Sequence, residues 1–454
     1  MASAGTPPPL GWFGVFRLGL VQAALGAIVI VTTSTLNRVM VVELALPAML
    51  PGALVGWHYA IQISRPHWGH GADKGGRRGP WILGGLAVLG VGAILAAMAT
   101  AQLSQPGLGG FALAFIAFTL IGAGVGAAGT NQLALLAART PPSRKAAAAA
   151  IVWIMMIVGF VITAATVGAV LDPFSLTRLV YVTAGVSVAA LVVASLAIVG
   201  LEPRARADSA GVLAETAPAA GSGSFRDVLA EVWADPPARR FTIFVFVSML
   251  AYSAQDLILE PFAGLIYGYT PGESTALAGT QNGGVLIGMI ITAIAGTVIG
   301  KSSARFMRAW TVGGCIASAF SLAALAAAAR MGTALPLEPL VFVLGLSNGA
   351  FAVAAIGSMM TLASAGPAGR EGIRMGLWGA SQAMAFGLGG FLGAVALDVM
   401  RVVLGDVSGA FFTVFAAEGA LFAVAAGLAL RVGETGPSDI RLPALPAGEH
   451  LPAE

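Results

Sequence analysis

The sequence predicts an all-α polytopic membrane protein, with twelve transmembrane helices arranged as two six-helix halves. Three observations predict this fold class. Of the 454 residues, 57% are hydrophobic and only 10% are charged, whereas soluble domains carry about 25% charged residues. Apolar runs recur along the whole chain, and the basic residues gather in alternate loops between them. The 61 glycines agree with close packing of helices in lipid.

The individual spans are apolar runs of about 20 residues or more, the length that crosses a bilayer as a helix. We expect no cleavable signal peptide, because residues 1–10 lack a basic segment and the first apolar run is too long. The twelve predicted spans are 13–36, 43–64, 81–102, 111–138, 147–171, 178–200, 240–266, 273–299, 306–330, 337–363, 374–398 and 408–431.

The loops between these spans differ in charge. Of the 24 Lys and Arg residues, twenty fall on one side, and only Arg38, Arg178, Arg330 and Arg401 fall on the other. Basic residues are retained on the cytoplasmic side. The sequence therefore predicts that both termini are cytoplasmic, which requires an even number of spans.

The longest polar gap divides the chain into halves. The predicted parts are a cytoplasmic N-terminal segment (1–12), an N-terminal half (13–200), a linker (201–239), a C-terminal half (240–431) and a cytoplasmic tail (432–454). An amphipathic helix is expected at about 225–235, because Phe225, Val228, Leu229, Val232 and Trp233 share one helical face. This helix would lie either on the membrane surface or against the protein's own underside.

The two halves resemble each other in sequence. Pro142 precedes Trp153 by eleven residues between the fourth and fifth spans, and Pro367 precedes Trp378 by eleven between the tenth and eleventh. The loop between the second and third spans, GHGADKGGRRGPW, has a degenerate counterpart at residues 300–308. Repeated halves joined by a long loop are a feature of secondary transporters.

That loop carries a spacing, Gly-x-x-x-Asp-Lys-x-Gly-Arg-Arg, that resembles the signature of the major facilitator superfamily. The resemblance implies a major facilitator fold in which this loop is a cytoplasmic latch between the halves. Its carboxylate can sit at a helix N-terminus, and its guanidinium groups can pair with acids or lipid headgroups. The latch residues are Gly69, Asp73, Lys74, Gly76, Arg77 and Arg78. This motif therefore indicates the fold of the protein, but it does not indicate which ligand the protein binds.

Polar residues inside the spans are the candidates for function, because each costs about 2.5–3.5 kcal/mol at a helix centre. The seventh span contains Gln255, Asp256 and Glu260. Asp256 and Glu260 are spaced i, i+4, which predicts a shared helix face, and Pro261 is expected to break the helix beside Glu260. Four further candidates for ligand binding are His58, Gln281, Asn282 and Glu418.

A second polar cluster is predicted at the membrane face away from the latch. It consists of Asn37, Arg38 and Glu43 at the end of the first span and Glu273 at the start of the eighth. Arg38 has two candidate partners, Glu43 and Glu260. Glu418 lies near the middle of the twelfth span, where it is either protonated or paired.

Several classes of function are not supported. A net charge of +3 does not indicate a nucleic-acid partner, and one cysteine, Cys315, provides neither a disulfide nor a multi-cysteine metal site. No phosphate-binding loop, zinc-protease motif or serine-hydrolase motif occurs. We expect no nucleotide, no structural metal and no enzymatic turnover. His58 is the one intramembrane histidine that could ligate a metal, and packing is the commoner role.

Four stretches together resemble one branch of the superfamily. The chain is similar to the PucC/LhaA group, the bacteriochlorophyll delivery family of purple phototrophic bacteria, over residues 12–432. The loop at 65–82 looks closer to a homologue associated with pigment-biosynthesis genes. The stretches are TLNRVMVVELALPA (35–48), RPHWGHGADKGGRRGPWI (65–82), RRFTIFVFVSMLAYSAQDLILEPFAG (239–264) and TPGESTALAGTQNGG (270–284).

The resemblance implies a membrane assembly factor that binds or delivers bacteriochlorophyll, or a precursor, during assembly of light-harvesting antenna complexes. It implies antenna polypeptides and pigment-biosynthesis enzymes as partners, and a place in the bacterial inner, intracytoplasmic photosynthetic membrane. Glycine faces at 122–129 and 387–393 admit either a flat macrocycle or a packed helix. The alternative function is a proton-coupled transporter of a small solute or pigment precursor, with Asp256 or Glu418 as the coupling acid.

Overall fold

The computed structural model is helical, with no strand in the residues that it describes. Eleven helices among these residues are long and apolar enough to cross a membrane. The second predicted span is occupied by a shorter helix, which completes the twelve segments. The described residues are 9–65, 68, 77–105, 107–141, 144–202, 233–298, 304–364 and 371–431.

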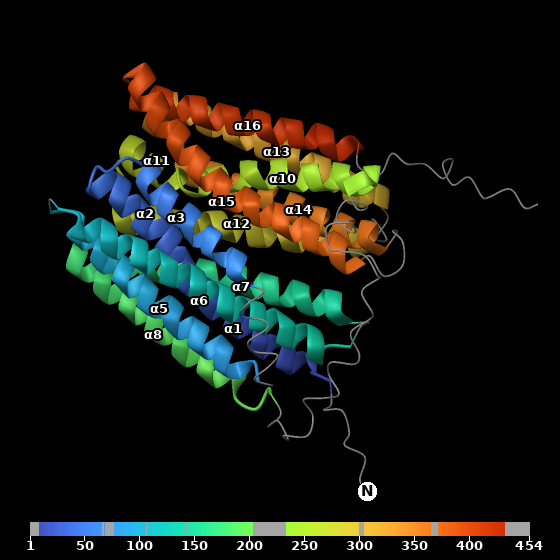
Figure 1. Cartoon of the computed structure of the whole chain (residues 1–454). Helices are drawn as coiled ribbons and strands as arrows, with labels where there is room; N and C mark the ends of the chain where they lie inside the picture. Colours follow the sequence, from blue (N-terminus) through green and yellow to red (C-terminus); the bar gives the residue numbers. More distant parts are fainter. Residues whose placement is uncertain are drawn as a thin grey trace, which may run out of the picture.

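The N-terminal half is formed by the first six segments (Figure 1). Its first segment combines α1, two π-helical stretches (η1 and η2) and α2, and its second segment is α3 continued by the 3-10 turn η3. The bounds are α1 Trp12–Ile30, η1 Val31–Thr35, α2 Leu36–Arg38, η2 Val39–Glu43, α3 Met49–Ile61, η3 Gln62–Ser64, α5 Gly79–Gln102, α6 Gly109–Arg139, α7 Lys145–Leu171 and α8 Leu176–Ile198.

The C-terminal half repeats this arrangement with a second set of helices. Its first segment is also interrupted, between α10 and α11, and a 3-10 turn, η6, follows α13. The bounds are α10 Pro236–Asp256, α11 Leu259–Tyr267, α12 Pro271–Val298, α13 Ala304–Met331, η6 Gly332–Ala334, α14 Leu337–Ser364, α15 Glu371–Leu404 and α16 Val407–Arg431.

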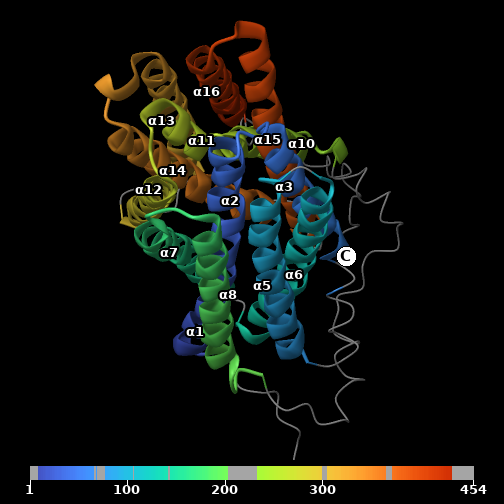
Figure 2. The same cartoon turned by 90° about the vertical axis from the view of Figure 1, so that its left-hand side faces the viewer.

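Each half has its own apolar core. Nearly all members of one buried cluster lie between Leu10 and Leu201, and nearly all members of the other lie between Phe241 and Ala429. In the first half α5 packs on α6 and α1 on α7; in the second, α13 packs on α16 and α12 on α14. Figure 2 shows the C-terminal group of helices above the N-terminal group.

The halves meet along two helix pairs, α7 with α12 and α3 with α15. Glycines bring these helices close together. A Cβ on Gly168 would lie 2.8 Å from the carbonyl oxygen of Gly272, and a Cβ on Gly52 would lie 2.8 Å from the Cβ of Ala394. The interface therefore depends on small residues, as helix packing in lipid does.

The two ends of the bundle are named here by the chain termini. The terminal end, on the right in Figure 1, is where α1 begins at Trp12 and α16 ends at Arg431; the opposite end carries α2 and α11. The glycine faces are helix-packing surfaces: Gly122 lies against the backbone of His58, and Gly393 lies against the backbone of Ala254.

Candidate functional site

The seventh segment breaks between α10 and α11. The helix α10 ends at Asp256, the Ile258 amide donates to the Gln255 carbonyl oxygen (3.1 Å), and α11 begins at Leu259. The break that Pro261 predicts is present, at Leu257 and Ile258. Pro261 is the third residue of α11 and has no N–H to donate to the Leu257 carbonyl oxygen four residues earlier, so that oxygen is left for a donor from another segment.

The break separates the two acids that the i, i+4 spacing placed on one face. Asp256 is exposed, whereas Glu260 is 3% exposed. The turn at Leu257 and Ile258 lies between the two acids, and their shared face stays a prediction. Asp256 borders accessible space, and Glu260 belongs to the buried interface.

The end of the first segment packs against this break. The widened turns of η1 and η2 flank α2, and such π-helical turns occur often at functional sites. Asn37 Nδ2 donates to the Leu257 carbonyl oxygen at 2.6 Å. Arg38 donates to Glu43 at 2.5 Å and to the Tyr269 carbonyl oxygen at 2.5 Å. Arg38 therefore pairs with Glu43 and bridges the two halves. The π-helical turns were not predicted, because no residue pattern in 31–43 indicates them.

Several buried polar atoms beside the break have no hydrogen-bond partner among the described residues. They are Asn37 Oδ1, Arg38 Nε, both side-chain polar atoms of Gln255 and both carboxylate oxygens of Glu260. Glu260 lies within electrostatic range of Arg38. Buried polar groups are usually hydrogen-bonded, so this part of the interface can bind a polar group that enters between the halves.

The Asp256 carboxylate interacts electrostatically with groups from both halves. It lies within electrostatic range of Tyr59 on α3, Tyr252 on α10 and Glu418 on α16. The rings of Tyr59 and Tyr252 both pack on Phe386 of α15, at 6.1 Å and 5.7 Å between centroids. An accessible carboxylate and two phenols beside an aromatic surface can hold a ligand that has both a flat apolar part and polar substituents.

The remaining acid and the histidine are enclosed. Glu418 is 3% exposed, and neither of its carboxylate oxygens has a partner in the part of the chain that the structure describes. His58 is 1% exposed, and its Nε2 accepts from Gln62 Nε2 at 2.8 Å. Gln62 in turn accepts from Arg65. The Nε2 of His58 is therefore engaged within its own segment.

The polar residues of α12 have local roles. Glu273 and Thr270 cap the helix reciprocally: the Thr270 amide donates to the Glu273 carboxylate (2.8 Å), and the Glu273 amide donates to the Thr270 hydroxyl (3.1 Å). Asn282 donates to the Ala278 carbonyl oxygen at 2.8 Å, and Gln281 is 8% exposed. Of the predicted far-side cluster, Asn37, Arg38 and Glu43 lie together, and Glu273 caps α12.

The latch lies partly outside the described residues, which exclude Gly69, Asp73, Lys74 and Gly76. The described part contacts Glu202, which follows α8. Glu202 accepts from the amides of Arg78 (2.5 Å) and Gly79 (2.9 Å), and its carboxylate lies 4.0 Å from Arg77 Nε. Glu202 was not among the predicted site residues, although its place directly after an apolar span is a signal that could have indicated it.

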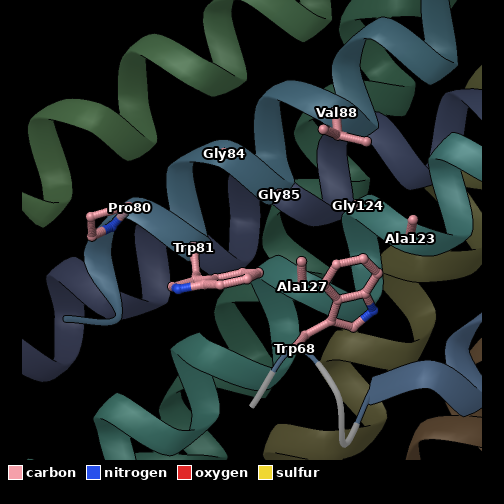
Figure 3. A pocket seen from close by; sticks show the side chains of 9 residues that line it. All are labelled: Trp68, Pro80, Trp81, Gly84, Gly85, Val88, Ala123, Gly124 and Ala127. Carbon is pink, nitrogen blue, oxygen red and sulfur yellow. The ribbon is translucent and has the colours of Figure 1, made fainter. Parts of the chain in front are cut away.

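An apolar cavity of about 300 Å³ opens between α5 and α6, close to the start of α5 (Figure 3). The indole rings of Trp68 and Trp81 lie 6.2 Å apart at its edge, and Trp68 Nε1 donates to the Ser64 hydroxyl at 2.9 Å. This cavity was not predicted, since its lining is apolar. It is lined by Trp68, Pro80, Trp81, Gly84, Gly85, Val88, Ala123, Gly124 and Ala127.

Solved transporters share this architecture. A peptide transporter, POT, in complex with sulfate has a TM-score of 0.65 and 18% identity, over 94% of this chain and 97% of that one. A D-xylose–proton symporter has a TM-score of 0.66 and 15% identity, over 92% and 97%. The chain is a multi-pass membrane protein with the major facilitator fold, as predicted; at these identities the likeness concerns the fold alone.

Sequence comparisons assign the chain to one family within this fold. Residues 35–436 match the family described as PUCC protein, and the chain belongs to that family. It is 50% identical over 442 residues to the "Bacteriochlorophyll synthase 44.5 kDa chain" of Rhodobacter capsulatus, covering 97% of this chain and all of that protein. "Protein PucC" of the same organism is 30% identical over 435 residues, covering 92% and 91%. The resemblance seen in the sequence is confirmed.

Proposed function

We propose that this protein binds bacteriochlorophyll or a precursor and delivers it to antenna polypeptides, without enzymatic turnover. Membership of the PUCC family and the pigment-related name of the 50% identical relative support this proposal. The proposed location is the intracytoplasmic photosynthetic membrane, with both termini cytoplasmic. The predicted charge asymmetry of the loops supports that orientation.

The observation that carries the proposal is the exposed carboxylate of Asp256 between the two halves, near Tyr59 and Tyr252. A carboxylate can bind the magnesium of the pigment or a water on it, and oxygen ligands suit that ion. The phenols can donate hydrogen bonds to carbonyl groups at the edge of a macrocycle. Half-buried aromatic rings offer the apolar surface that such a ligand requires.

The test is co-purification from a phototrophic host in mild detergent, followed by absorption spectroscopy. Wild-type protein should carry bacteriochlorophyll, and Asp256→Asn should lower pigment affinity by about tenfold or more, since a hydrogen bond to a charged group contributes about 1.5–3 kcal/mol. Asp406→Asn is the matched control, because Asp406 caps α16 within one half. Pigment-free wild-type protein and normal antenna levels in a deletion strain would refute the proposal.

A second candidate function is proton-coupled transport of a small solute or pigment precursor. The transporter fold favours it, as does the buried carboxylate of Glu418, which has no hydrogen-bond partner among the residues that the structure describes. Reconstituted vesicles with an imposed proton gradient should then accumulate a precursor, and Glu418→Gln should abolish coupling. Vesicles that take up no precursor under any gradient would exclude this candidate.

The name of the 50% identical relative raises the question of a role in pigment synthesis. We propose that the protein is a partner of pigment-biosynthesis enzymes rather than the catalyst. Purified protein should show no bacteriochlorophyll synthase activity alone, and affinity capture from the host should retain such enzymes. Synthase activity in the purified chain would contradict this assignment.

A further inference from the structure

Two aspartates at the opposite end occupy matching places in the two halves. Asp172 follows α7, the fifth segment, and Asp398 lies near the end of α15, the eleventh segment. Both segments end at the opposite end of the bundle (Figure 1). The fifth and eleventh segments correspond when six-helix halves repeat, so the two carboxylates come from corresponding segments of the internal repeat.

Each aspartate caps a helix of the other half. Asp172 accepts from the Thr270 hydroxyl at 2.7 Å and from the Gly272 amide at 3.3 Å, at the start of α12. Asp398 accepts from the amides of Ala48 (3.1 Å) and Met49 (2.7 Å), at the start of α3. A carboxylate at a helix N-terminus satisfies free amides and interacts favourably with the helix dipole.

Three other described carboxylates cap helices, and none of them crosses between the halves; one of the three, Glu273, caps its own helix α12. Glu202 caps α5, and both belong to the N-terminal half. Asp406 caps α16 through the amides of Ser408 (3.0 Å) and Gly409 (2.8 Å), and both belong to the C-terminal half. A rotation of one half against the other would leave these three caps intact, whereas it would separate Asp172 and Asp398 from their helices.

We propose that Asp172 and Asp398 form a paired polar gate, which keeps the halves together at the opposite end and directs access to the interior toward the terminal end. Each carboxylate loses its amide donors when that end opens, so opening must break both caps. The glycine contacts of α7 with α12 and of α3 with α15 set the spacing that lets the caps form. The effects of removing the two caps on opening of that end should therefore add.

The gate can be measured without any ligand, so its test does not depend on the proposed function. The only cysteine, Cys315, is buried. In a Cys315→Ala background, spin labels at Thr177→Cys and Thr333→Cys report the separation of the halves at the opposite end. Labels at Val199→Cys and Arg239→Cys report the terminal end. All four positions are exposed.

Double electron–electron resonance in lipid nanodiscs should give a single short distance at the opposite end for the parent protein. The pair Asp172→Ala with Asp398→Ala should populate a longer distance there and a shorter one at the terminal end, with each single change giving a smaller fraction. Asp406→Ala, which removes a cap at the same end but within one half, should leave both distances unchanged.

Unchanged distances in a folded, monodisperse double variant would overturn the proposal, as would an equal shift in Asp406→Ala. If the double alanine variant does not fold, Asp172→Asn and Asp398→Asn decide the question. Asparagine keeps one acceptor oxygen but loses the charge, so the gate predicts an intermediate shift for each. If neither asparagine variant shifts the distances, the proposal is also overturned.

Discussion

Arg38 shows how one side chain joins the two halves. Its guanidinium is 1% exposed and donates both to Glu43 in its own segment and to the Tyr269 carbonyl oxygen across the interface. Arginine suits this position because its planar group carries several donors in a fixed geometry. Sequence analysis identified Arg38 and both candidate acids, but it could not choose between them.

Replacing Arg38 should therefore weaken the molecule more than replacing a half-buried arginine whose contacts stay within one half. Arg38→Gln removes a buried cation from both acceptors and should lower the free energy of unfolding by about 1–3 kcal/mol. The measurement is thermal unfolding in detergent. Arg178→Gln is the control, because the Arg178 side chain donates to the Pro173 carbonyl oxygen at a surface position in a single half. Equal losses in both variants would contradict the prediction.

Asp256 and Glu260 lie on the two sides of one helix break. Their identity as functional candidates follows from their cost in lipid. The turn at Leu257 and Ile258 separates an exposed Asp256 from an enclosed Glu260. Pro261 predicted this break, because it has no N–H to donate to the Leu257 carbonyl oxygen, which accepts from Asn37 instead.

At the scale of helices, the pair α12 and α14 is packed through glycines. Gly284 and Gly288 on α12 face the α14 backbone, and Gly345 and Gly349 on α14 face the α12 backbone. Each pair has the spacing of small residues four apart that lets transmembrane helices approach closely. The composition indicated such packing in general, but only the structure shows which helices it joins.

Glycine-to-alanine substitutions in α12 should differ in their effect on stability according to whether the added methyl group meets α14. A Cβ on Gly284 would meet the α14 backbone, including the Leu346 amide nitrogen at 2.9 Å, whereas a Cβ on Gly283 would meet nothing within 4 Å. Gly284→Ala should therefore cost about 1–3 kcal/mol through overpacking, and Gly283→Ala should be neutral or slightly stabilising. Thermal unfolding of the two variants in one detergent gives the comparison.

At the scale of the whole molecule, the halves are held together mainly where α7 meets α12 and α3 meets α15, with polar cross-links near the opposite end. The accessible Asp256 lies within range of groups from both halves. Any ligand held by Asp256 and Tyr59 together would therefore respond to the relative position of the halves. This links the proposed pigment site to the proposed gate.

The orientation in the membrane is a prediction at this scale. The charge asymmetry of the loops predicts that the terminal end faces the cytoplasm. Reporter fusions after Arg431 should be active only for a cytoplasmic reporter, and a thiol reagent that cannot cross the membrane should label Thr333→Cys from the periplasm in the Cys315→Ala background. Labelling of Thr333→Cys only after the membrane is permeabilised would reverse the assignment.

The sequence by itself determined the class of the molecule: its helical segments, the division into halves and the family. These depend on hydropathy, charge and local motifs, which are properties of neighbouring residues along the chain. The tertiary structure decided which side chains meet. Asp172 and Asp398 cap helices of the other half, and Glu202 caps α5. Asp256 is accessible, whereas Glu260 is buried. Each of these features depends on contacts between segments distant in the chain. Such contacts follow from the register in which two packed halves meet, and no local pattern specifies that register.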